Sequence, residues 1–133
     1  MNNRGLYLAA RILIPIVFVG LGLERLGAGA GVIVREGAPL STGALVFSAF
    51  ELIAGLLVMF GWKVRWIAGL LAAFILVDAF AAHGFWRYPA AEQHGQLLHF
   101  LKNLSTLGGL LLLVAMDLAT ATGGRSKPGR SET

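Results

Sequence analysis

The sequence predicts an all-α fold, an integral membrane bundle of four helices with both termini in the cytoplasm. Of its 133 residues, 56% are hydrophobic and 14% are charged, whereas a soluble domain carries about 25% charged residues. Four apolar segments are each long enough to cross roughly 30 Å of bilayer hydrocarbon as a helix, at about residues 6–26, 42–62, 64–83 and 97–116. Lysines and arginines gather at the N-terminus, between the second and third segments and in the tail, which predicts that these parts are cytoplasmic.

The four segments define one domain, residues 1–120, followed by a tail, residues 121–133, whose glycine, serine and basic residues predict disorder. They leave no room for a soluble catalytic domain.

The absence of cysteine excludes a thiol relay and thiolate metal ligation within this chain. The net charge of +4 comes from residues that flank the segments and form no basic patch with interleaved aromatics, so no nucleic-acid partner is predicted. The predicted location is the bacterial cytoplasmic (inner) membrane, which the chain crosses several times.

The first segment is interrupted by Pro15, which can kink a helix where neighbouring helices satisfy the freed carbonyl group. Arg11 lies near the start of this segment and Arg25 at its outer end. A cleaved signal peptide is the alternative interpretation, because residues 28–30 are all small. The charged pair Glu24 and Arg25 directly before that stretch argues against cleavage.

The second segment holds the most isolated charge in the chain, Glu51, on the same helical face as Ser48 and Gly55. Glu51 lies roughly 12–14 Å from the outer end of the helix, too deep for a carboxylate to reach water. Two interpretations stay open. Glu51 is either a protonated or salt-bridged group that holds the bundle together, or a group that handles a proton or anchors a substrate.

The third segment follows a short turn at residues 61–66, so the second and third segments are expected to form an antiparallel hairpin. Asp78 lies in the outer third of this segment, where it is expected to be a paired structural group, and His83 ends the segment. About 140° of helical rotation separates the two positions, so they need not share a face. Residues 84–96 are expected to form an outer loop with aromatic side chains at the membrane interface.

The fourth segment places four polar residues on one helical face: His99, Lys102, Asn103 and Thr106. A lysine within hydrocarbon costs a few kcal/mol or more unless it finds a partner or reaches the membrane surface. With both termini inside, these residues lie in the outer half of the bundle, close to the level of Glu51. We therefore expect a Glu51–Lys102 ion pair, with an outward-reaching Lys102 and a neutral Glu51 as the alternative.

The candidate ligand-binding or proton-handling residues share this place in the outer half of the bundle: Glu51, His83, His99, Lys102 and Asn103. Four further residues are expected to support them: Arg25, Asp78, Ser48 and Thr106. No residue is assigned a catalytic role. No metal site is predicted, because His83, His94 and His99 lack the tight spacing of metal ligands even when Glu51 is added.

Several short motifs together resemble the DoxX family of small bacterial four-helix membrane proteins. They are FVGLGLERL (18–26), GAP (37–39), ELIAGLL (51–57), GWKVR (61–65), HGFW (83–86), KNL (102–104) and GGLL (108–111). The resemblance covers about residues 5–115, and the family often has a lysine where this chain has Arg25. It implies a role beside membrane oxidoreductases, since members are known as a subunit of a thiosulfate- or quinol-linked oxidase and as a scaffold that joins redox-protection enzymes.

Three functions are therefore weighed. In an accessory subunit of a quinone-linked oxidoreductase, Glu51 or His83 would accept a proton while Lys102 and Asn103 donate to a quinone carbonyl, and quinone would be the cofactor. In a non-catalytic scaffold for redox or stress-protection enzymes, the cluster would only hold the helices together. A small proton-coupled transporter is the third, although such proteins carry their essential glutamate in the first span. A subunit or accessory protein is favoured over a self-sufficient enzyme, with the lipid bilayer, oxidoreductase subunits or further copies of the chain as partners.

Overall fold

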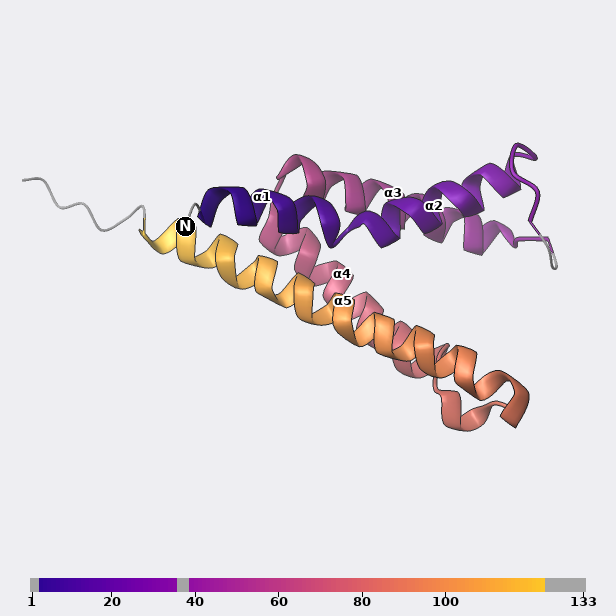
Figure 1. Cartoon of the computed structure of the whole chain (residues 1–133). Helices are drawn as coiled ribbons and strands as arrows, with labels where there is room; N and C mark the ends of the chain where they lie inside the picture. The colour runs from indigo at the N-terminus through magenta and orange to yellow at the C-terminus, as the bar shows by residue number, and fades with distance from the viewer. Residues whose placement is uncertain (1–2, 36–38, 124–133) are drawn as a thin grey trace, which may run out of the picture.

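The computed structural model describes residues 3–35 and 39–123, and within these ranges every regular element is a helix (Figure 1). In chain order the elements are α1 (Asn3–Leu13), α2 (Ile16–Gly29), α3 (Thr42–Phe60), α4 (Val64–Ala81), the 3-10 helix η1 (Phe85–Arg87) and α5 (Ala90–Gly123). Four stretches are long and apolar enough to cross a membrane: Arg4–Gly29, Thr42–Phe60, Val64–Arg87 and Ala90–Thr122. The prediction of an all-α membrane protein with four spans is confirmed.

Pro15 divides the first span into α1 and α2. The Ile14 amide still donates to the Ala10 carbonyl of α1, whereas the amides of Phe18 and Val19 turn to the carbonyl of Pro15 and begin α2. Proline has no amide hydrogen and its ring conflicts with the preceding turn, so the helical hydrogen bonds restart at this residue. The kink that Pro15 suggested is therefore a full break between two helices.

The fourth span is longer than the sequence suggested, because α5 begins at Ala90 and ends at Gly123. The amides of Glu92 and Gln93 donate to the carbonyl of Pro89, which starts the helix. The expectation of a loop up to residue 96 was wrong here, since polar residues can form a helical turn beyond the hydrocarbon. The last residues of α5 also overlap the start of the predicted tail, and residues 124–133 lie outside the described residues.

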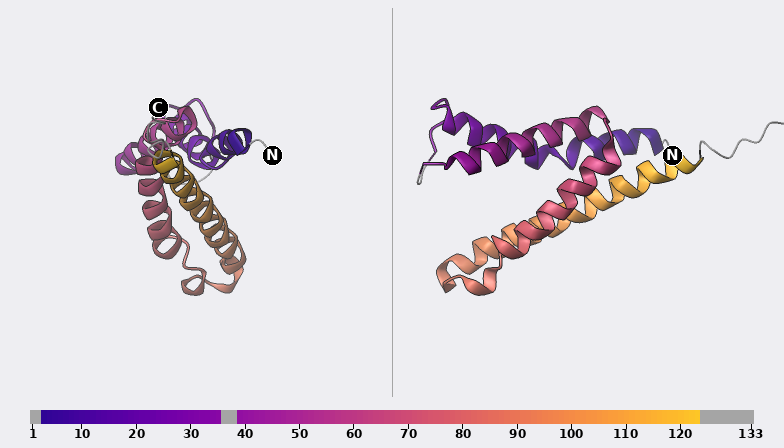
Figure 2. Two further views of the ribbon diagram at one scale, coloured as in Figure 1. Left: turned by 90° about the vertical axis from the view of Figure 1, so that its left-hand side faces the viewer. Right: turned by 180° about the vertical axis from the view of Figure 1, so that it is seen from behind.

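The helices form two antiparallel hairpins, α2–α3 and α4–α5, which are joined by the short turn between α3 and α4 (Figures 1 and 2). The start of α1 and the end of α5 lie at one end of the molecule, which we call the terminal end. The hairpins lie together there and diverge toward the opposite, distal end. An even number of spans brings both chain ends to one side. That this side is cytoplasmic stays a prediction from the basic residues.

The core is built from side chains of both hairpins. Its buried apolar residues are Phe18, Ala54, Val58, Val64, Ala68, Leu71, Ala72, Ile75, Leu110 and Leu113. Within the first hairpin, α2 and α3 approach closely at two glycines. A Cβ atom at Gly22 would lie 2.9 Å from the Ser48 carbonyl oxygen, and one at Gly55 would lie 2.8 Å from a methyl group of Val19. Small residues of this kind allow membrane helices to touch along their backbones.

Arg11, an unusual charge inside an apolar segment, has a structural partner at the terminal end. Its Nε donates to the carbonyl oxygen of Met59 at 3.1 Å, in the last turn of α3. The carbonyl groups of a helix C-terminus lack intrahelical partners and carry partial negative charge, so a guanidinium group stabilises them. Arg11 therefore ties the first span to the end of α3, away from the polar residues of the distal half.

Candidate functional site

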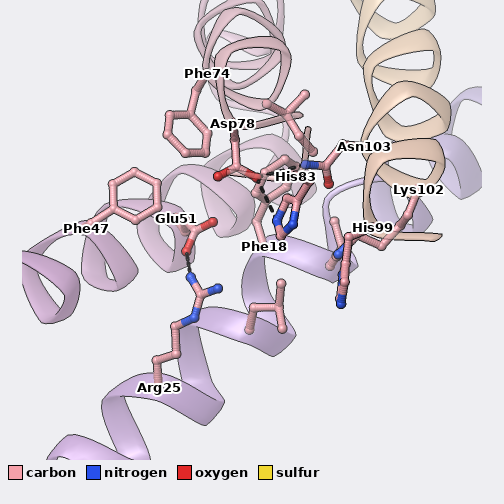
Figure 3. Close-up of a pocket in the computed structure, with 13 residues that line it drawn as sticks. Phe18, Arg25, Phe47, Glu51, Phe74, Asp78, His83, His99, Lys102 and Asn103 are labelled. Atoms are coloured by element: carbon pink, nitrogen blue, oxygen red, sulfur yellow. Dashed lines mark hydrogen bonds and ion pairs between the residues drawn. The ribbon is translucent and has the colours of Figure 1, made fainter. Parts of the chain in front are cut away.

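The polar residues of the distal half surround a pocket between the two hairpins (Figure 3). Its volume is about 140 Å³, and helices α2, α3, α4 and α5 all contribute to its wall. The lining residues are Val17, Phe18, Leu21, Arg25, Phe47, Glu51, Phe74, Ile75, Asp78, His83, His99, Lys102 and Asn103. The structure thus brings together all five candidate ligand-binding residues and two of their four expected supports.

Glu51 forms an ion pair with Arg25, the nearest charged residue of the neighbouring helix α2. The Arg25 Nη1 donates to the Glu51 Oε2 at 2.9 Å, and the side chain of Glu51 is only 6% exposed. Within the described residues Glu51 has no ion pair with Lys102, so the expected Glu51–Lys102 pair was wrong. The reason is the packing: α2 and α3 belong to one closely packed hairpin, whereas Lys102 lies on α5 of the other hairpin.

Asp78 has its own partners, which connect α4 to α5. The Nδ2 of Asn103 donates to its Oδ2 at 2.8 Å, and the Nε2 of His83 lies 3.5 Å from the same oxygen. The other ring nitrogen of His83 lies 2.8 Å from the Oε1 of Gln96. Helix α4 ends at Ala81, so His83 lies beyond the helix and turns back toward Asp78. The helical rotation of about 140° between Asp78 and His83 therefore does not apply, because His83 is not part of the helix.

Lys102 and His99 lie on the open side of the pocket, and both are exposed. The His99 ring stacks on the His83 ring, with their centroids 4.9 Å apart and their planes inclined by 23°. In the part of the chain that the structure describes, no carboxylate lies within 4.0 Å of the Lys102 ammonium group. Among the described residues, Lys102 is therefore a charged residue of the pocket that has no ion-pair partner.

The other two supporting candidates do not line the pocket. The hydroxyl of Ser48 donates to the Ala44 carbonyl at 2.8 Å, and that of Thr106 donates to the Lys102 carbonyl at 2.9 Å. Both bonds lie within the residue's own helix, one turn back, which is a common way to satisfy a hydroxyl group in a membrane helix. Ser48 is fully buried under α2, beside Gly22.

The apolar wall of the pocket contains three phenylalanines that sequence reasoning missed: Phe18, Phe47 and Phe74. The rings of Phe47 and Phe74 lie 4.5 Å apart and join α3 to α4 across the pocket. In a chain of this composition an isolated phenylalanine is an ordinary lipid-facing or core residue. Nothing in the sequence distinguishes these three from the rest.

The donor set of the pocket does not form a metal site. Among residues 3–35 and 39–123, no three histidine, aspartate or glutamate side chains gather closely enough to hold a metal ion. The acidic groups instead hold basic or amide groups. Among the described residues, the pocket combines an aromatic wall, two carboxylates that accept hydrogen bonds and an ammonium group with no carboxylate within 4.0 Å.

Asn103 provides the first test of this arrangement. Replacing Asn103, which is 3% exposed, with leucine should leave Asp78 without its amide donor and lower the free energy of unfolding by about 1–2 kcal/mol. The matched control is Thr106→Val one turn later, which removes a bond within α5 and should change stability by less than about 0.5 kcal/mol. Thermal unfolding in detergent, followed by circular dichroism, measures both. Equal losses in the two variants would contradict the proposed link between α4 and α5.

The family model for the SURF4 family matches residues 2–124 of the 133 residues. The chain belongs to the SURF4 family. It is 37% identical to the inner membrane protein YqjF of Escherichia coli (strain K12) over 109 residues, which cover 80% of this chain and 79% of that protein. It is 28% identical over 112 residues to the inner membrane protein YphA of the same organism, covering 81% of this chain and 80% of the relative.

A eukaryotic member is also similar. The Surfeit locus protein 4 homolog of Schizosaccharomyces pombe (strain 972) is 28% identical over 117 residues, which are 85% of this chain but only 35% of that longer protein. No solved structure matches this chain. The names of the bacterial relatives, together with the four apolar helices, confirm the predicted localisation as a multi-pass protein of the bacterial inner membrane.

The SURF4 match overturns the resemblance to the DoxX family. The motifs behind that resemblance are short and rich in glycine and leucine, residues that recur wherever membrane helices pack closely. They describe the architecture rather than a particular family. The predicted role beside a quinone-linked oxidoreductase depended on that resemblance, so this prediction was wrong as well. Neither redox scaffolding nor proton-coupled transport gains specific support from the SURF4 family.

Proposed function

We propose that this SURF4-family chain is a membrane-embedded binding protein, which holds the polar head of a lipid-like amphiphile in the pocket between its hairpins. The observation that carries the proposal is the composition of the pocket wall. Phe18, Phe47 and Phe74 face the same space as Lys102 and His99 (Figure 3). Ligand sites typically combine such an apolar wall with a few convergent polar groups.

The size of the pocket limits what can enter it. A volume of about 140 Å³ is close to the roughly 150 Å³ of a protein cavity that holds one benzene molecule. It is enough for a headgroup of a few heavy atoms and too small for a whole lipid. The chain of the ligand would therefore lie outside the pocket, against apolar side chains such as Leu98 and Leu101, which are exposed on α5.

The arrangement of the hairpins supports entry from the side. The pocket lies where the hairpins diverge, and its lining includes Leu21 of α2 and Lys102 of α5, neither of which is buried. An amphiphile in the membrane places its polar head near the surface and its chain in the hydrocarbon, so its head can enter such a side opening while its chain stays in the lipid. With the predicted cytoplasmic termini, the ligand would come from the outer leaflet.

A pocket-filling variant tests the proposal. The probes are two 12-carbon amphiphiles, a carboxylic acid and an alcohol, each with a photoactivatable diazirine beside the polar end and added to the protein in lipid nanodiscs. With the wild type we expect crosslinks at pocket residues of α2 and α5, located by peptide mass spectrometry. Leu21→Trp should lower their yield by about tenfold or more, because the indole occupies the cavity.

The matched control is Leu23→Trp, on the same helix at a position that is 54% exposed. This variant should retain the wild-type crosslinks, because its indole faces away from the pocket. The proposal is wrong if crosslinks from both probes are spread evenly over the lipid-facing surface of the wild type, or if the two tryptophan variants behave alike.

A further inference from the structure

We propose that the head taken up by this pocket is an anion, so that the ligand is an acidic amphiphile whose charged oxygen atoms bind the ammonium group of Lys102. This inference rests on the proposed function and names the ligand class for the same site. The juxtaposition that carries it is a lysine at the mouth of the pocket with no carboxylate within 4.0 Å among the described residues, while the carboxylates of Glu51 and Asp78 already accept hydrogen bonds.

Each of the two carboxylates of the pocket already accepts a hydrogen bond. Glu51 accepts a hydrogen bond from Arg25, and Asp78 accepts one from Asn103 while His83 lies 3.5 Å from the same oxygen. Charged groups at membrane depth pair with one another or with a ligand. Arg25 and Glu51 satisfy this rule with each other, and Asp78 has an amide donor and a nearby imidazole. Lys102 has no carboxylate within 4.0 Å among the described residues. The missing partner of the site is therefore negative.

A second donor lies beside Lys102. His99 precedes it by three residues on α5, so the two side chains extend from the same helical face. In the described part of the chain the His99 ring stacks on His83 and makes no hydrogen bond, which leaves its ring nitrogens available to a ligand. An ammonium group and an imidazole on successive turns can together bind the oxygens of one carboxylate or phosphate.

The carboxylates also determine where the anion would lie. Glu51 and Asp78 are less exposed than Lys102 and carry the same sign as the ligand, so they disfavour an anion deep in the pocket. The head would stay at the open side, near Lys102 and His99. This position suits a headgroup that remains attached to a chain in the surrounding lipid.

A cationic head is the competing assignment, since the pocket contains two acidic side chains. Both already have donors, and a cation near the mouth would face the like charge of Lys102. An amine would have to share Glu51 with Arg25, or Asp78 with Asn103. The structure therefore favours an acid over an amine.

The test compares 12-carbon probes that share a chain and differ in their heads. Dodecanoate, dodecanol and dodecylamine each compete with the diazirine-bearing alcohol for the protein in nanodiscs at pH 7. For the wild type we expect dodecanoate to compete about 10- to 100-fold more strongly than dodecanol, as expected for a charge-assisted hydrogen bond. Lys102→Met should bring the two within about threefold, and Lys102→Arg should restore most of the preference, because the cation is kept.

The controls separate the possible outcomes. Lys63→Met removes a lysine at the terminal end, outside this pocket, and should leave the preference unchanged. Equal competition by acid and alcohol, or stronger competition by the amine, overturns the anionic assignment while the proposed amphiphile site stands. Competition by acetate as strong as that by dodecanoate overturns it in favour of a small soluble anion. If no probe competes, the proposed function fails and the inference with it.

Discussion

Replacing Arg25 with methionine is expected to lower the free energy of unfolding by about 3 kcal/mol. The variant would leave the Glu51 carboxylate, which is 6% exposed, without the donor that lies 2.9 Å away. A buried charge that loses its partner costs about 3–5 kcal/mol, and the lower end applies because the Arg25 side chain is 31% exposed. Unfolding of the purified protein with increasing sodium dodecyl sulfate, followed by circular dichroism, measures the loss.

The double variant Arg25→Met/Glu51→Met should recover most of that stability, because the unpaired carboxylate is removed together with its partner. The matched control is Arg35→Met, whose partner Glu24 lies 3.1 Å away and whose side chains are both about 40% exposed. An exposed pair of this kind contributes less than about 1 kcal/mol. If Arg25→Met and Arg35→Met cost the same, or if the double variant is no more stable than Arg25→Met, Glu51 does not depend on Arg25 for its burial.

The partner of Glu51 marks the limit of what the sequence could predict about the site. Helical periodicity shows which residues of one helix share a face. Of the four residues that it grouped on α5, His99, Lys102 and Asn103 line the pocket and Thr106 does not. Periodicity does not show which helices are neighbours. The close approach of α2 and α3 and the divergence of the hairpins bring Arg25 to Glu51, and both features depend on tertiary packing.

The partners of Asp78 could not be predicted for a different reason. Asn103 lies on α5, and hydropathy alone does not give the register of α5 against α4. His83 was assigned to the end of a continuous helix, whereas α4 stops at Ala81 and the chain turns at η1. Gln96 was assigned to a loop, although it belongs to the extended first part of α5. Apolar length predicts where a helix can cross a membrane, and it does not predict where that helix ends in the interface.

The fold itself was largely contained in the sequence, because the cost of exposing backbone polar groups to lipid leaves helices as the structure for long apolar segments. The family could not be predicted from the sequence, since the motifs that suggested the DoxX family reflect helix packing. Gly22, in the first of these motifs, illustrates the point. A small residue at this position is required by the contact of α2 with α3, whatever the protein binds.

Replacing Gly22 with leucine is accordingly expected to cost about 3 kcal/mol or more and to separate α2 from α3. A Cβ atom there would lie 2.9 Å from the Ser48 carbonyl oxygen and 3.1 Å from the Leu52 amide nitrogen, and backbone atoms cannot move aside as a flexible side chain can. Because Arg25 follows one turn later, the Arg25–Glu51 pair should break as well. The measurement is the same detergent unfolding curve, with the yield of folded protein as a second readout.

Gly20→Leu is the matched control, since a Cβ atom at Gly20 meets nothing within 4 Å. Leucine has a higher helix propensity than glycine, so this variant should be neutral or slightly more stable. Gly22→Ala adds only the Cβ atom and should fold with an intermediate loss. That variant should also bind the 12-carbon acid more weakly, because displacing α2 moves Leu21 and Arg25 in the pocket wall. Wild-type stability for Gly22→Leu would show that the contact between α2 and α3 does not hold the hairpin together.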